Sequence, residues 1–215
     1  MFKNVLLAMV VLIAGSQKSF GEALWTNPIT GTNPNTANPY TSGQSVAAGL
    51  TVSGIGRGTG INGDNANNRY SANNWNTPAL DINDYFTLKL TPDAGNSLSL
   101  TNFVYTGQAS GTGPTAFAFR SSIDTFVSDI GTPTATGATI SLSSGSFQNL
   151  SSATEFRLYG WGASGSTGTF SVNDFTFNGS VTAVPEPTSI ALVSLMCCTG
   201  FVAAIRRRIA KSKIA

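Results

Sequence analysis

The sequence predicts an all-β protein, an antiparallel, jelly-roll-like β-sandwich between two apolar terminal segments. In many short segments apolar and polar residues alternate with a two-residue period, which is the pattern of half-buried strands. Clusters of Gly, Asn, Pro and Ser separate these segments, as they do at turns. The same residue types interrupt every stretch of the body in which a long amphipathic helix would have to form.

The individual strands are expected from local patterns. In 86–91, Phe86, Leu88 and Leu90 alternate with Thr and Lys, and the turn-forming segment 92–96 follows. Segment 98–105 is apolar on both parities, which predicts a bulge or a strand covered on both faces. Further strands are expected at 46–52, 116–120, 140–142, 156–161 and 170–177, with a short helical turn near 122–126. Aromatic volume for the core comes from Phe86, Phe103, Phe117, Phe119, Phe147, Phe156, Phe170, Phe175 and Phe177.

The first 23 residues have the organisation of a secretory signal. Lys3 precedes an apolar run over 5–14, and Gly21 and Ala23 place small residues where signal peptidase requires them. Ten helical residues extend about 15 Å, which is too short for a bilayer core of roughly 30 Å. We expect a signal helix within 1–23, cleaved after Ala23 or after Gly21; a buried first helix is the alternative. Residues 24–45 are then an extended mature N-terminus, and 46–183 the sandwich.

The body of the protein is acidic, although the whole chain has a formal net charge of +2. Residues 24–184 contain five basic and eight acidic side chains, which gives a net charge of −3. The Lys and Arg residues of the body form no cluster that could bind nucleic acid. The chain has no histidine, and both cysteines lie in the C-terminal apolar run. These counts exclude disulfides in the body, thiolate or imidazole zinc sites, and catalysis by Ser-His or Cys-His pairs.

Three aromatic side chains are candidates for stacking on sugar rings: Trp75, Tyr159 and Trp161. Tyr159 and Trp161 share a parity, so they lie on the same side of their expected strand. If that side faces outward, the two rings form a binding platform. If it faces inward, they belong to the core.

Carboxylates offer two further hypotheses. Asp64, Asp81 and Asp84 lie among many Asn side chains, and calcium prefers six to eight oxygen ligands. The spacing is not that of an EF-hand, so the alternative to a calcium site is a solvated, turn-rich loop. Apart from calcium, we expect no cofactor. Asp81 with Asp84, or Asp124 with Asp129, are the pairs that a glycoside hydrolase would need. Because Asp beside Asn, Ser and Gly normally forms turns, we expect no catalytic residue.

The C-terminal segment 184–215 has three physical parts. Pro185 and Pro187 flank Glu186 and keep the chain extended. Residues 188–205 carry no charge and would span about 27 Å as a helix, which predicts a transmembrane helix. The basic run 206–208 follows, and by the positive-inside rule it stays in the cytoplasm. A plain single-pass anchor is the alternative to a processed signal.

This order of Pro-Glu-Pro, apolar helix and arginine cluster resembles the PEP-CTERM sorting signal of exported bacterial proteins. The resemblance implies that Pro185, Glu186 and Pro187 are recognised by exosortase, a transpeptidase-like membrane enzyme. It also implies that Ile190–Ile205 is a transient inner-membrane helix. Arg206, Arg207 and Arg208 would be its cytoplasmic stop.

The body is also similar to domains that such tails carry. Segments 156–162 and 172–179 resemble the closing strands of their jelly rolls, which implies a fold and no activity. We therefore expect a non-enzymatic protein that crosses the inner membrane to the cell surface or extracellular matrix. Hosts of this family typically make extracellular polysaccharide, a candidate partner. A carbohydrate-binding module, calcium-dependent or not, is the alternative function, and a glycoside hydrolase is a more remote one.

Overall fold

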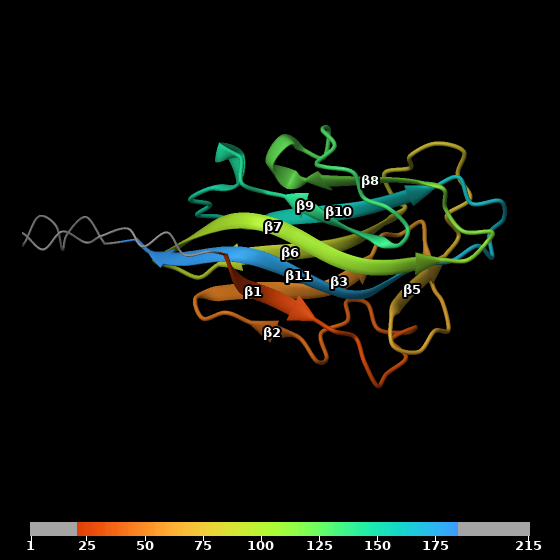
Figure 1. Cartoon of the computed structure of the whole chain (residues 1–215), viewed down its shortest axis with the longest axis horizontal. Helices are drawn as coiled ribbons and strands as arrows, with labels where there is room; N and C mark the ends of the chain where they lie inside the picture. The colour runs from red at the N-terminus through yellow and green to blue at the C-terminus, as the bar shows by residue number, and fades with distance from the viewer. Residues whose placement is uncertain (1–20, 185–215) are drawn as a thin grey trace, which may run out of the picture.

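The structure, a computed structural model, describes residues 21–184. These residues form two antiparallel β-sheets and the loops that connect their strands. The two sheets pack face to face as a β-sandwich (Figure 1). The seven-stranded sheet contains β1 (Glu22–Asn27), β2 (Ser45–Val46), β4 (Asn62–Gly63), β5 (Tyr70–Asn73), β7 (Asn96–Ala109), β9 (Gly137–Ser141) and β11 (Phe170–Ala183). The four-stranded sheet has the order β3 (Leu50–Arg57), β6 (Tyr85–Pro92), β10 (Thr154–Trp161) and β8 (Ala116–Ser121).

The prediction of antiparallel all-β structure is confirmed, and most expected strands lie within one to a few residues of their observed bounds. The expected helical turn is the 3-10 helix η1 (Ser122–Asp124), and a second one, η2 (Gly145–Phe147), was not expected. Of the two alternatives given for 98–105, a bulge or a strand covered on both faces, the bulge is present. Asn102 pairs with Asn178 but Leu100 pairs with Gly179, so Thr101 is an extra residue in β7.

The longest pairing in the described chain joins β7 to β11, two strands of 14 residues each. On its other side β11 pairs with β1 and β5. The boundary expected at residue 46 is therefore wrong, because β1 belongs to the sandwich. Trp25 of β1 is fully buried, with its ring centroid 4.9 Å from that of Phe175 and 5.8 Å from that of Phe177. A segment read as an extended N-terminus thus supplies core volume.

The core between the sheets is mainly aromatic. The ring of Phe103 lies 4.8 Å from that of Phe119, across the sandwich, and 4.5 Å from that of Phe177 on the neighbouring strand. All three side chains are fully buried. Burial of rings of this size is the dominant stabilising contribution in such a layer, at roughly 25 cal/mol per Å² of apolar surface.

A glycine allows the N-terminal segment to cross the edge of the four-stranded sheet. Gly54 has φ +84° at the bulge of β3, and a Cβ there would lie 2.6 Å from the carbonyl oxygen of Tyr40. Tyr40 and Ile55 exchange two backbone hydrogen bonds at this point, with N···O distances of 2.8 and 3.1 Å. Only glycine combines that backbone conformation with that close approach.

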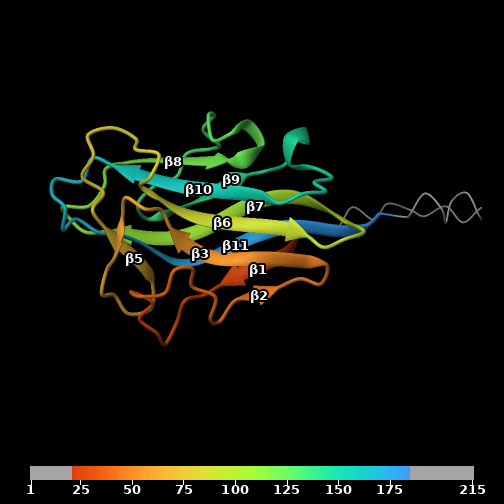
Figure 2. The same ribbon diagram turned by 180° about the vertical axis from the view of Figure 1, so that it is seen from behind.

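The first and last described residues lie at the same end of the sandwich, here called the terminal pole (Figures 1 and 2). Glu22 pairs with Gly179, four residues before the end of β11. The amide of Val184 donates to Gly95 O at 2.8 Å, at the turn between β6 and β7. The opposite end, the distal pole, contains the loops that follow β1, β3, β5, β7 and β10. We include in it the loop between β4 and β5, which is hydrogen-bonded to the loop after β1.

Residues 1–20 of the expected signal helix and the expected transmembrane helix after residue 187 lie outside the described chain. The end of the expected signal helix is wrong, because Glu22 and Ala23 are the first two residues of β1 and pair with Gly179 and Asn178. Between residues 21 and 184 no helix is long and apolar enough to cross a membrane.

Candidate functional site

Trp75, a predicted sugar-stacking residue, is a core residue. None of its surface is exposed, and its indole N–H donates to the carbonyl oxygen of Ala72 at 2.8 Å. Its ring packs edge-on against Phe86 and Phe170, at centroid distances of 5.2 and 5.9 Å. The prediction of glycan contact at Trp75 is therefore wrong, because a ring enclosed on both faces has no surface for a sugar.

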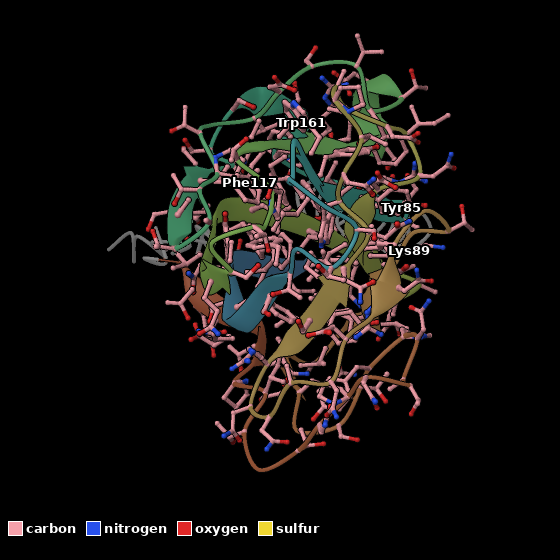
Figure 3. All side chains as sticks on the ribbon, turned by 90° about the vertical axis from the view of Figure 1, so that its right-hand side faces the viewer. Tyr85, Lys89, Phe117 and Trp161 are labelled. Atoms are coloured by element: carbon pink, nitrogen blue, oxygen red, sulfur yellow. The ribbon has the colours of Figure 1, made fainter. Side chains whose placement is uncertain are left out.

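Tyr159 and Trp161 lie on the outer face of the four-stranded sheet, as their shared parity allows. Phe156 and Leu158 of the same strand point into the core and are fully buried. Trp161 is half-buried at the end of β10. Figure 3 looks onto the distal pole and shows Trp161 at the top of the view, with Tyr85 of β6 to its right.

Tyr159 is nevertheless only 1% exposed, because neighbouring side chains cover its ring. Tyr85 lies 5.5 Å away between ring centroids, and the Arg120 guanidinium lies 5.8 Å from the Tyr159 ring centre. The Arg157 guanidinium is sandwiched between the rings of Tyr85 and Phe126, at 4.2 and 3.9 Å. These stacked cations hold the loop after β8 on the sheet. The side faces outward, yet no two-ring platform results, because Tyr159 is covered; of these two rings, Trp161 keeps exposed surface.

The three aspartates predicted as calcium ligands do not form one cluster. Asp84 is 3% exposed, accepts a hydrogen bond from Thr77 at 3.1 Å, and has a pKa raised chiefly by burial. Asp81 lies close to it, whereas Asp64 belongs to a different loop and accepts a hydrogen bond from Ser71 at 3.3 Å. No group of three His, Cys, Asp or Glu side chains that could hold a metal occurs among residues 21–184.

The loop after β1 and the loop between β4 and β5 line an open polar hollow that the sequence patterns did not reveal. We call it the amide hollow; its volume is about 390 Å³ and it is lined by Gly31, Thr32, Asn33, Asn67 and Asn68. Hydrogen bonds join the loops: the Gly31 amide donates to Asn68 Oδ1 at 2.7 Å, and the Asn68 amide to Thr32 O at 2.8 Å. The Ala66 amide donates to Asn33 Oδ1 at 3.3 Å. These three hydrogen bonds fix the two loops relative to each other.

Arg57, at the end of β3, holds the first of these loops against the sheet. Its guanidinium donates to the carbonyl oxygens of Pro34, Asn35 and Ala37, at distances of 3.0 to 3.3 Å. On its other side Nε and Nη2 both donate to Ser71 O in β5, at 3.0 and 2.8 Å. Arg57 is only 8% exposed, and burial lowers its pKa.

The ring of Tyr70 stacks on this guanidinium, with the Arg57 Cζ 3.8 Å from the ring centre. The single O–H of Tyr70 is within hydrogen-bond distance of two acceptors, Ala37 O at 3.0 Å and Asn38 Oδ1 at 3.2 Å. Burial raises the pKa of the Tyr70 phenol to about 12. Arg57 and Tyr70 thus form one buried unit beneath the loop that lines the amide hollow.

No protein-family model matches the chain, and a search of curated proteins returns no match.

The different burial of the three tryptophans predicts which of them a soluble quencher can reach. Trp25 and Trp75 are fully buried, and Trp161 is half-buried. We expect Trp161→Phe to abolish most quenching of the tryptophan emission by acrylamide, and Trp75→Phe to leave the quenchable fraction in place. Equal quenching in both variants would contradict the assignment of Trp161 as the accessible ring.

The buried phenol predicts how stability changes at high pH. Because Tyr70 ionises near pH 10 when unfolded and near 12 when folded, its contribution is complete below pH 10 and lost as the pH rises to 12. The advantage of the wild type over Tyr70→Phe in free energy of unfolding should shrink by on the order of 2 kcal/mol across that interval. Urea titrations at several pH values measure it, and an advantage that stays constant would refute the burial of the phenol.

Proposed function

We propose that this chain is a non-enzymatic protein exported to the cell surface or extracellular matrix, and that its C-terminal segment is a PEP-CTERM-type sorting signal. The proposal is supported by the order of parts in the sequence: an N-terminal apolar run, a β-rich body, Pro185-Glu186-Pro187, an uncharged segment and three arginines. The absence of histidine supports the non-enzymatic part. The sorting motif itself lies outside the described residues.

One observation carries the proposal: both ends of the described chain emerge at the terminal pole. The folded domain extends to Val184, whose amide donates a hydrogen bond to Gly95 O. Pro185 follows immediately in the sequence. An N-terminal export signal and a C-terminal membrane segment then act on the same end of the sandwich. The distal pole, with the amide hollow and Trp161, faces away from the membrane.

The jelly-roll likeness belongs to this proposal. The two segments that resemble closing strands of jelly rolls, 156–162 and 172–179, fall almost entirely within β10 and β11. Each of these strands has partners on both sides in its sheet. Their central position agrees with the resemblance, which concerns the fold and brings no catalytic residue.

Processing through the motif predicts the mass of the mature protein. In the native host, the surface protein should begin at Glu22 or Leu24 and end close to Pro187, because both terminal segments are removed. Intact-mass measurement of protein released from the cell surface tests this. Recovery of a chain that extends to Ala215 would contradict processing and favour a plain membrane anchor.

A pair of variants assigns that processing to the motif. Glu186→Ala should leave the protein uncleaved in the inner membrane fraction. Thr182→Ala, an exposed change at the end of β11, should be processed like the wild type. Equal release of both variants would contradict recognition of Glu186.

A further inference from the structure

We infer that the amide hollow is a binding site for a neutral, hydroxyl-rich ligand, such as one or two sugar units of a glycan. The lining of the hollow is polar and uncharged. Asn33, Asn67, Asn68 and Thr32 give it a lining of amides, a hydroxyl and backbone groups, without a charged side chain. A side-chain amide offers both donors and an acceptor, which matches adjacent sugar hydroxyls that need both. An apolar ligand would gain nothing from such a lining.

Hydrogen-bonding capacity remains at the hollow after the two loops are joined. Asn68 uses Oδ1 to accept from Gly31, while neither its Nδ2 nor any side-chain atom of Asn67 bonds to another residue within 21–184. Asn67 and Asn68 are both exposed. Asn68 has φ +59°, a left-handed conformation that asparagine tolerates and that the bond from Gly31 helps to hold.

The loop that contributes Asn33 is held from beneath by Arg57. A loop that served only as a solvated turn would not require a buried guanidinium beneath it, because burying a charge is costly. Here Arg57 donates to three carbonyl groups of the loop that includes Asn33, and Tyr70 stacks on Arg57. Pre-organised polar groups lose less entropy when they bind, which matters for a ligand held mainly by hydrogen bonds.

Other ligand classes fit less well. An anion would find no cation in the lining, and a metal ion would find no group of three acidic, His or Cys side chains anywhere in the described chain. A hollow of about 390 Å³ is at the small end of ligand pockets, which agrees with one or two sugar units. The site lies on the distal pole, and the inference does not depend on sorting through the C-terminal signal.

Binding can be tested on the full-length chain, isotope-labelled with ¹⁵N and kept in detergent, by following the side-chain amide signals of asparagine. The probes are cellohexaose, mannohexaose and maltohexaose, with hexagalacturonate as the anionic comparison, each added to about 10 mM in the presence of EDTA because such contacts are weak. We expect at least one neutral hexasaccharide to shift the signals of Asn67 and Asn68. Signals from asparagines outside the hollow should stay in place.

A matched pair of variants localises the response. Asn67→Ala should weaken binding by about three- to tenfold, the effect of one lost hydrogen bond, whereas Asn76→Ala, exposed in another loop, should change nothing. The inference is overturned if none of the neutral sugars shifts these signals, or if only hexagalacturonate does. It is also overturned if the response requires added calcium or if both variants bind equally. Each of these outcomes is independent of whether the tail is processed.

Discussion

The fold of the distal pole depends on a buried cation that forms no ion pair within the described chain. Arg57 directs its five hydrogen bonds at four backbone carbonyl groups, three in the loop 34–37 and one, that of Ser71, in β5. Desolvating a guanidinium costs several kcal/mol, and charged hydrogen bonds contribute roughly 1.5–3 kcal/mol each, so a full set of partners is required. The stacked ring of Tyr70 covers the remaining face of the cation.

This arrangement links elements that are distant in the sequence. Arg57 belongs to the four-stranded sheet and Ser71 to the seven-stranded one, so the guanidinium joins the two layers at the distal pole. The loop that it holds then lines one side of the amide hollow, and hydrogen bonds from Gly31 and to Thr32 position Asn68 on the other. The hydrogen bonds of Arg57 therefore both stiffen the loop after β1 and shape one side of the amide hollow.

Alternation of apolar residues was sufficient to predict the all-β class and most strands, because burial on one face imposes a period of two. The loss of alternation in 98–105 indicated the bulge only as one of two alternatives. It did not predict β1, since the contribution of Trp25 to the core depends on its pairing with β11. Parity placed Tyr159 and Trp161 on one face, but the covering of Tyr159 comes from other strands and a loop. The amide hollow was not predictable from local pattern, as its loops meet only through long-range hydrogen bonds. Arg57 stands between glycines in a segment without a charge pattern, so its burial left no signal in the sequence.

Hydrogen exchange of the Arg57→Lys variant tests most directly whether the guanidinium organises the distal pole. Lysine keeps the positive charge but replaces the planar fork with a single ammonium, so it cannot reach both Ser71 and the loop carbonyl groups. The amides of Gly31 and Asn68 should then exchange at least about tenfold faster, while those of the β7–β11 ladder, such as Phe177, keep their rates. Unchanged exchange at Gly31 and Asn68, or the same acceleration throughout the sandwich, would contradict the role assigned to Arg57.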